Sequence, residues 1–276
     1  MIPVPYIIDW SEKAPWVANY YVEQDLIITR ALTDIFSDEF LAKELAFRGG
    51  TALHKLYLSP QPRYSEDIDL VQIHPGPIKP IIYRLGEVLS YLPDKVIKQK
   101  RYNNTMLFRI QSEIPPVVQL RLKVEINCYE HFNELGIVQV PFSYDSLWES
   151  GSCKITTYKL EELLGTKMRA LYQRRKGRDL FDLAYALEKA EVNPDEIVRC
   201  YRRYIGFVVD TPPTYKQFML NMEEKMNNPE FLSDTTDILR PGLSFDPQAA
   251  WDIVRDELVS RLQTESERIN KGPAQE

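Results

Sequence analysis

The sequence predicts an α+β protein: an N-terminal lobe of residues 1–155 with a small mixed sheet, then an all-helical C-terminal lobe of residues 156–276. Two segments, "EDIDLVQI" and "VVQLRLKVEINCYE", alternate apolar and polar residues, which is typical of half-buried strands. From about Lys159 the apolar residues recur instead at helical spacing. With 276 residues and 44% hydrophobic content, the chain can build one substantial core or two smaller lobes.

The N-terminal lobe is predicted from its periodicity and its turn residues. Apolar residues such as Leu26, Ala31 and Phe36 lie at helical spacing, and the two glycines after "ELAFR" mark a tight turn. Two prolines in "SPQPRYS" exclude regular structure there. The expected elements are a helix over 17–46, a short strand closing it at "ELAFRGG", a helix over 51–58, the strand "EDIDLVQI", a helix over 78–92, and strands at "KVIKQKRY", "TMLFRIQS" and "VVQLRLKVEINCYE".

The C-terminal lobe is predicted to contain only helices. These are expected over 159–174, 178–190, 194–206, 213–226 and 247–268, and the tail 270–276 is expected to be loose.

Composition and charge exclude several classes of protein. The net charge of −6 does not favour nucleic-acid binding by itself, although a local basic surface remains compatible with it. Three scattered cysteines and three scattered histidines fit neither a disulfide scaffold nor a zinc site. The N-terminus "MIPVPYIIDWSEKAP" lacks a basic region and a long apolar run, so we expect no signal peptide. The longest apolar runs of the chain are too short to span a bilayer, and we expect a cytoplasmic protein.

Two aspartates in the strand "EDIDLVQI" are the first candidates for chemistry. Asp67 and Asp69 are two residues apart, so their side chains project from the same face of a strand. Carboxylates that close repel each other, and we expect a positive group between them. Mg²⁺ or Mn²⁺ suits such hard oxygen ligands, and Glu125 on another strand would supply a third carboxylate. A plain solvent-facing side of an antiparallel sheet is the alternative for that strand.

A Gly-Gly-Thr turn precedes the aspartates. Gly49 and Gly50 would let the backbone approach a phosphate, and Thr51 would open a helix whose N-terminus favours anions. Arg48 and Arg63 flank the turn and the aspartates. Either arginine would bind phosphate or neutralise the two carboxylates.

These motifs together resemble a known family. "GGTALHKLYLSPQPRYSEDIDL" is similar to the first motif of the polymerase-β-like nucleotidyltransferases, in the branch of AbiEii/AbiGii-type toxins of abortive-infection toxin–antitoxin pairs. "LKVEIN" resembles the second motif, and "KMRALYQRRKGRDLFDLAYAL" resembles the motifs that contain a lysine and Arg-Asp-x-x-Asp. The resemblance covers about residues 45–190.

The resemblance implies a polymerase-β-like nucleotidyltransferase lobe and a metal-dependent transfer of a nucleotidyl group from an NTP to an acceptor. In relatives the acceptor is tRNA, so the implied partners are an NTP, RNA (a tRNA 3′ end) and a cognate antitoxin, and the implied effect is a block of translation. The implied roles are metal ligation by Asp67, Asp69 and Glu125, phosphate binding by Arg48, Gly49, Gly50, Thr51 and Lys167, and further active-site roles for Ser65 and Asp179.

Lys167 and Asp179 also stand out by their positions. Lys167 falls on the apolar stripe of its predicted helix, where it either snorkels at a lobe boundary or points into a cleft. Asp179 is in the first turn of the next helix, where it would also complement the helix dipole, and Asp182 would pair with a nearby arginine. The basic residues of 167–178 would hold nucleotide or RNA, or would form a solvated helix face.

Two alternatives remain at this point. The same fold would modify a protein or small-molecule hydroxyl, because the choice of acceptor resides in loops. Otherwise the chain is a non-catalytic binding module, which the presence of Asp67, Asp69 and Lys167 argues against.

Overall fold

The computed structural model describes residues 2–263, and within it the chain forms two compact units. Unit 1 runs to Lys159 and takes in Asp237–Leu243 from later in the chain, and unit 2 comprises Leu160–Thr236 and the chain from Ser244. The expected division after residue 155 falls inside a strand, Ser150–Tyr158, and the returning segment was not predicted. The predicted helical residues 264–268 and the tail 270–276 lie outside the described residues.

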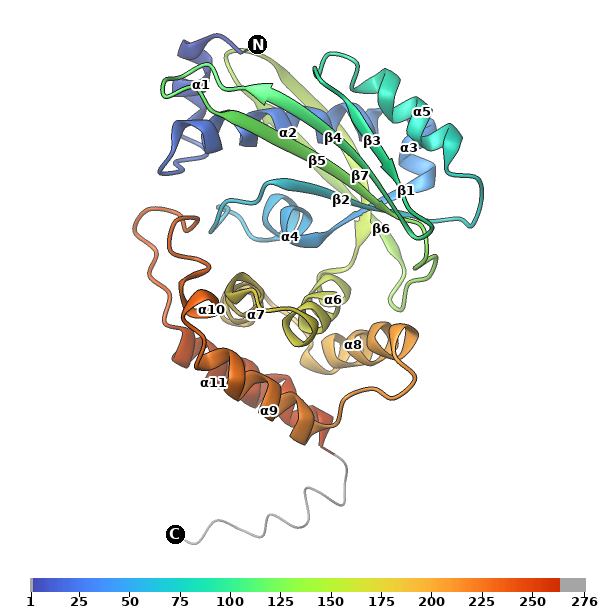
Figure 1. Ribbon diagram of the computed structural model, residues 1–276, viewed down its shortest axis with the longest axis vertical. Coiled ribbons are helices and arrows are strands. Elements are labelled where there is room, and N and C mark those ends of the chain that lie inside the picture. The colour runs from blue at the N-terminus through green and yellow to red at the C-terminus, as the bar shows by residue number, and fades with distance from the viewer. Residues whose placement is uncertain (1, 264–276) are drawn as a thin grey trace, which may run out of the picture. The chain divides into compact units, whose positions relative to one another are not determined.

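Unit 1 is built on a mixed sheet in the order β3-β4-β5-β2-β1-β7-β6 (Figure 1). The strands β2 and β5 pair in parallel, as do β1 and β7, and the other neighbours are antiparallel. The mixed sheet confirms the predicted fold class, but β6 and β7 were not predicted. The strands are β1 (Leu45–Arg48), β2 (Asp67–Gln72), β3 (Val96–Gln99), β4 (Asn103–Gln111), β5 (Gln119–Asn127), β6 (Ile137–Asp145) and β7 (Ser150–Tyr158).

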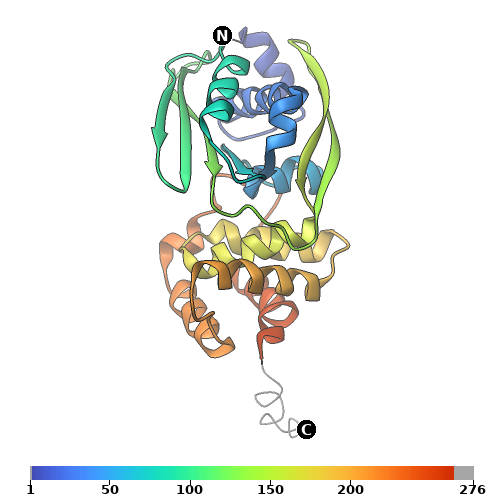
Figure 2. The ribbon, with the colours of Figure 1, turned by 90° about the vertical axis from the view of Figure 1, so that its right-hand side faces the viewer.

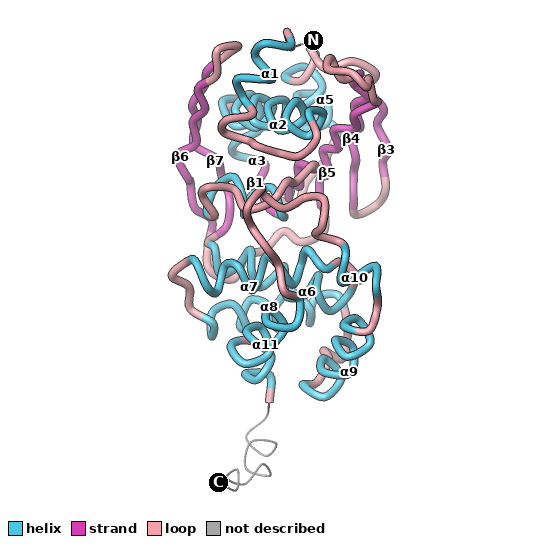
Figure 3. The backbone as a smooth tube through the Cα atoms, turned by 90° about the vertical axis from the view of Figure 1, so that its left-hand side faces the viewer, coloured by secondary structure: helices cyan, strands magenta, loops and turns pink. Residues whose placement is uncertain are grey.

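The sheet curves around helix α2 (Asn19–Ser37), which is why that helix is buried on nearly all sides (Figures 2 and 3). The single helix expected over 17–46 is wrong, since the chain breaks at Asp38. That residue is extended, and its side chain accepts a hydrogen bond from Leu41 N (2.9 Å), capping a new helix. The other helical segments of unit 1 are α1 (Val4–Trp10), α3 (Glu39–Glu44), α4 (Gly49–Ala52), the π-helical turn η1 (Leu53–Tyr57) and α5 (Lys79–Val88).

The segment that returns from unit 2 is fixed to the loop before β2. Tyr64 N donates to Ile238 O (2.7 Å) and Arg240 N donates to Pro62 O (2.8 Å). Arg63 and Leu239 form an antiparallel bridge between these hydrogen bonds. The irregular proline-containing loop therefore enters β2 with part of its backbone paired.

The residues of unit 2 that the structure describes, up to residue 263, form helices and connecting loops without a strand, as predicted. Helix α6 lies close to α8 because Gly165 has no side chain: a Cβ there would be 2.5 Å from Cys200 Cβ and 2.9 Å from Ile197 O. The helices are α6 (Leu160–Gln173), α7 (Gly177–Lys189), α8 (Pro194–Val208), α9 (Tyr215–Met226), α10 (Pro229–Ser233), α11 (Pro247–Glu257) and the 3₁₀ turn η2 (Val259–Leu262).

Within residues 2–263 we find no helix with the length and apolar character needed to cross a bilayer.

Candidate active site

Strand β2 places Asp67 and Asp69 on one face, as predicted. The intervening Ile68 and the following Leu70 are buried in the core, so the alternation of the strand turns both carboxylates the other way. The parallel pairing of β2 with β5 sets Asp67 beside Lys123 and Asp69 beside Glu125. Three carboxylates from two neighbouring strands therefore share one face of the sheet.

A positive group was expected between Asp67 and Asp69, but Lys123 lies instead between Asp67 and Glu125. Its Nζ lies 3.1 Å from Asp67 Oδ2 and 3.3 Å from Glu125 Oε2, so one ammonium group bridges carboxylates of two strands. The other oxygen of Glu125, Oε1, accepts a hydrogen bond from Asn103 Nδ2 on β4 (2.8 Å). These side chains are about one-third exposed, so the bridge is open to solvent on one side.

The pKa values of the site reflect burial first and crowded negative charge second. Burial raises the pKa of Asp67, and Glu66 and Glu125 raise it further against the opposing effect of Lys123. Burial and the charge of Asp67 raise the pKa of Asp69. Although desolvation lowers the pKa of Lys123, Asp67 and Glu125 raise it to about 12, so the ammonium stays charged near neutral pH.

Gly49 makes room for Asp69. Its φ of +81° is in the left-handed region that favours glycine, and a Cβ at this position would lie 2.2 Å from Asp69 Oδ2. The position of Asp69 therefore requires a glycine at residue 49. This requirement is separate from the phosphate binding that was predicted for Gly49.

Thr51 is turned toward the protein interior. It is almost fully buried, and its hydroxyl donates to Asp67 O (2.5 Å). The Thr51 and Ser65 hydroxyls lie 2.8 Å apart, and because one hydroxyl has one proton, Ser65 donates to Thr51. These two hydrogen bonds link Ser65 and Thr51, near the start of the helix, to the backbone of Asp67. The roles of Thr51 and Ser65 toward a nucleotide stay predictions.

Arg48 lies opposite Asp69 in the pairing of β1 with β2, but its ion-pair partner is Glu130. Glu130 is almost fully buried, and its charge holds the pKa of Arg48 above the ordinary value despite burial. Arg63 is also buried and donates to Tyr64 O (2.8 Å). Both arginines thus have structural partners, and phosphate binding by Arg48 stays a prediction.

Lys167 and Asp179 belong to unit 2, where they form a buried ion cluster. Lys167 Nζ lies 3.1 Å from Asp179 Oδ1 and 2.9 Å from Asp182 Oδ2, and both aspartates are fully buried. Arg174 also donates to both oxygens of Asp179 (2.7 and 2.8 Å). Burial would raise the pKa of Asp179, but the charges of Lys167 and Arg174 hold it below its usual value. The cluster gives Lys167 a structural role, and its predicted contact with a triphosphate is untested.

The basic segment 167–178 is less positive than its sequence suggests, because acidic residues of unit 2 pair with it. Arg175 contacts Glu224 (3.2 Å), and Arg178 and Lys176 both contact Asp234 (2.9 and 3.5 Å). Arg175 and Lys176 remain more than half exposed, so part of the charge still faces solvent.

The donor chemistry of the β2–β5 face suits a hard divalent cation, although its ligands do not yet converge. In residues 2–263 no three His, Cys, Asp or Glu side chains are disposed to ligate one ion together. Lys123 lies between two of the carboxylates. With Arg48 and Glu130 included, four carboxylates face two cations, which leaves two negative charges when all are ionised. One divalent cation would neutralise that excess.

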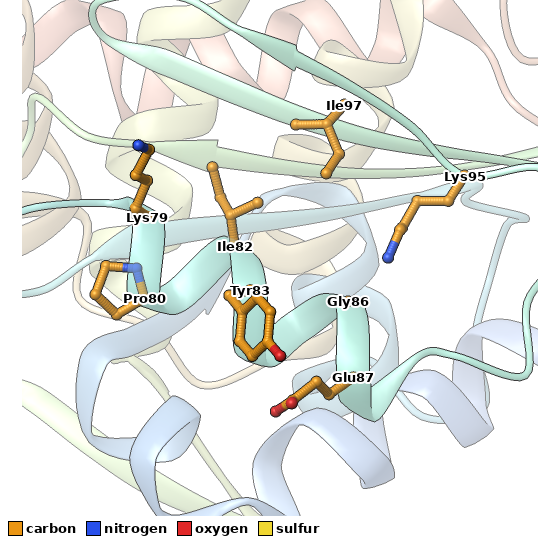
Figure 4. A pocket seen from close by; sticks show the side chains of 8 residues that line it. All are labelled: Lys79, Pro80, Ile82, Tyr83, Gly86, Glu87, Lys95 and Ile97. Carbon is orange, nitrogen blue, oxygen red and sulfur yellow. The ribbon is translucent and has the colours of Figure 1, made fainter.

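A hollow of about 560 Å³ between α5 and β3 is separate from this face (Figure 4). It contains none of the residues predicted for the site, and Tyr83 at its rim is 72% exposed. Its lining residues are Lys79, Pro80, Ile82, Tyr83, Gly86, Glu87, Lys95 and Ile97.

Three neighbours of the site were not assigned from the sequence: Lys123, Asn103 and Glu130. The spacing of Lys123 and Glu125, two residues apart on one strand, was a readable signal for the first. Asn103 and Glu130 carried none, because they reach the site through the pairing of β4 with β5 and through the turn after β5.

Comparison with protein families gives one match over most of the chain. The sequence pattern of the family described as "Nucleotidyl transferase AbiEii toxin, Type IV TA system" matches residues 30–257. This range includes every residue predicted for the site. A comparison with curated proteins gives no match.

Solved structures of similar fold include two bacterial proteins. The nucleotidyltransferase toxin MenT4 of Mycobacterium tuberculosis H37Rv aligns with a TM-score of 0.64 at 16% identity, covering 93% of this chain and 89% of its own. JHP933 of Helicobacter pylori aligns with a TM-score of 0.53 at 19% identity, covering 92% and 97%. At these identities the likeness concerns the fold.

Proposed function

The chain belongs to the AbiEii family of nucleotidyltransferase toxins, and from this premise we propose that it transfers a nucleotidyl group from an NTP to RNA, at the 3′ end of tRNA. The observation that carries the proposal is the face formed by β2 and β5. There Asp67, Asp69 and Glu125 lie together beside the glycine turn that opens α4.

Asp67, Asp69 and Glu125 are the residues that would hold Mg²⁺ or Mn²⁺. A bound divalent cation would neutralise charge on the phosphates and on the attacking oxygen. The chain's own contribution is positioning. Gly49 lets Asp69 lie against the turn, and the Thr51–Ser65 hydrogen bond fixes the backbone of Asp67.

The phosphates of the NTP would bind at the Gly49-Gly50 turn, where backbone N–H groups begin a helix. In the transfer, an acceptor hydroxyl oxygen bonds to the α-phosphorus while the bond from that phosphorus to the pyrophosphate oxygen breaks. Pyrophosphate leaves, and the proton of the hydroxyl passes to solvent or to a carboxylate. Ser65, next to the carboxylate strand, would contact phosphate, and Lys167 and Asp179 are proposed active-site residues on the resemblance of their motif.

Addition of nucleotides to a tRNA 3′ end would prevent aminoacylation and stop translation, and a cognate antitoxin would restrain this activity. The exposed basic residues of segment 167–178, such as Arg175 and Lys176, would contact the phosphates of the RNA.

Labelling with nucleotides tests the proposal. The protein is incubated with α-³²P-labelled NTPs, Mg²⁺ and total RNA, and RNA and protein are separated before autoradiography. Label in the tRNA fraction that is lost with Asp67→Asn supports the proposal. Label that enters protein and never RNA contradicts the RNA acceptor, and identical labelling by Asp67→Asn contradicts the assigned site.

A further inference from the structure

Lys123 lies between Asp67 and Glu125, where a divalent cation bound by these carboxylates would be expected. Its Nζ is 3.1 Å from Asp67 Oδ2 and 3.3 Å from Glu125 Oε2, and the register of β2 with β5 sets these carboxylates on adjacent strands. The ammonium group therefore provides the positive charge between carboxylates that the family's chemistry assigns to metal binding.

We propose that Lys123 is an exchangeable internal cation: it occupies the space between Asp67 and Glu125 in the metal-free protein, and a divalent cation binds only as the lysine leaves. This inference rests on the proposed function, because it requires that these carboxylates bind metal. It makes Lys123 a positioning residue that governs when the site accepts its cation.

The surroundings of Lys123 allow it to leave. The side chain is 35% exposed and has a long flexible stem, so its head can move into solvent without opening the core. Glu125 would remain in place, because Asn103 still donates to its Oε1. Arg48 differs, since it is paired with the buried Glu130 and its side chain is only 18% exposed. Of the two cations at this face, Lys123 is the one that can be displaced.

The exchange would couple metal binding to nucleotide binding. A triphosphate at the glycine turn brings phosphate oxygens that accept the displaced ammonium group. When metal binds alone, the displaced Lys123 has no other anion to pair with. When metal binds together with nucleotide, the ammonium group can pair with the phosphates. The free wild-type protein should therefore bind metal weakly, and nucleotide should strengthen the binding by a coupling that depends on Lys123.

Titration with Mn²⁺, followed by the electron paramagnetic resonance signal of the free ion, tests the exchange without any activity assay. Wild type, Lys123→Met and Lys123→Gln are titrated alone and with a non-hydrolysable NTP analogue. Lys154→Met, which removes an exposed lysine from β7, is the matched control for loss of charge. Circular dichroism confirms that each variant is folded.

Both Lys123 variants should bind Mn²⁺ about fivefold or more tightly than wild type in the absence of nucleotide, since a competing ion pair is removed. Their gain in affinity on adding the analogue should be smaller than that of wild type, and Lys154→Met should match wild type. Equal or weaker Mn²⁺ binding by the Lys123 variants overturns the exchange while leaving the proposed function intact. Failure of wild type and variants to bind Mn²⁺ even with the analogue overturns metal use by this face, and the exchange with it.

Discussion

Substitution of Gly49 by alanine should reduce the rate of nucleotide transfer strongly while reducing the stability of the protein only modestly. The added Cβ would lie 2.2 Å from Asp69 Oδ2, whereas an ordinary contact needs at least 3.4 Å, so the carboxylate must move by about 1 Å. A displacement of that size in a catalytic group costs about 100-fold in rate. The φ of +81° adds strain of about 1–2 kcal/mol in the free energy of unfolding, which a folded unit can tolerate.

Gly136→Ala is the matched control. Gly136 has a similar φ of +89°, but no atom lies within 4 Å of the added Cβ. Both variants should lose stability in thermal unfolding because of the strained φ, Gly49→Ala more so because of its contact with Asp69, while only Gly49→Ala should lose nucleotide transfer to RNA. If Gly49→Ala retains wild-type transfer, or if Gly136→Ala loses as much, the reasoning about the space shared by Gly49 and Asp69 is refuted.

Three further predictions concern stability. Glu23 is fully buried, and burial raises its pKa from 4.5 to about 7, so the wild-type protein loses stability as the pH rises through this interval. In denaturant unfolding, Glu23→Gln should therefore be about 2 kcal/mol more stable than wild type at pH 8 and no more stable at pH 4. Equal pH profiles for the two proteins would contradict the raised pKa. Thr51→Val removes the buried hydroxyl that donates to Asp67 O and should lower the free energy of unfolding by about 1–2 kcal/mol. An unchanged midpoint of denaturant unfolding would mean that this hydrogen bond does not contribute to stability. Lys167→Met removes the lysine that pairs with two buried aspartates, of which Asp179 keeps Arg174, and should destabilise unit 2 by about 3 kcal/mol. Lys176→Met removes a half-exposed lysine and should cost less than about 1 kcal/mol; equal thermal shifts would argue against the buried cluster.

The placement of Asp67 and Asp69 was predictable because it depends on local periodicity. Alternation fixes which residues of a strand share a face, and the helical spacing after Lys159 fixes the character of unit 2. The break at Asp38 was not predicted, because the apolar pattern continues across it and a single capping hydrogen bond decides the boundary.

The partners of the charged residues were not predictable, because they depend on register between segments far apart in sequence. Lys123 meets Asp67 only through the parallel pairing of β2 with β5, and Arg48 meets Glu130 across 82 positions. The apolar stripe correctly marked Lys167 as unusual, yet periodicity could not distinguish a phosphate ligand from a buried ion pair. Strand β6 was missed although its residues alternate in exposure from Val138 onward, because Pro141 within it argues against a strand. Strand β7 was missed because it begins with the small residues Ser150, Gly151 and Ser152.

Sequencing of tRNA 3′ ends tests the central claim most directly. Purified tRNA is incubated with Mg²⁺ and each NTP separately, with the wild-type protein or with Asp69→Asn, which keeps the size of the side chain and removes its charge. The account predicts added nucleotides at the 3′ ends with wild type and at least one NTP, and unmodified ends with Asp69→Asn. Unmodified ends with wild type and every NTP, or equal addition by both proteins, would contradict it.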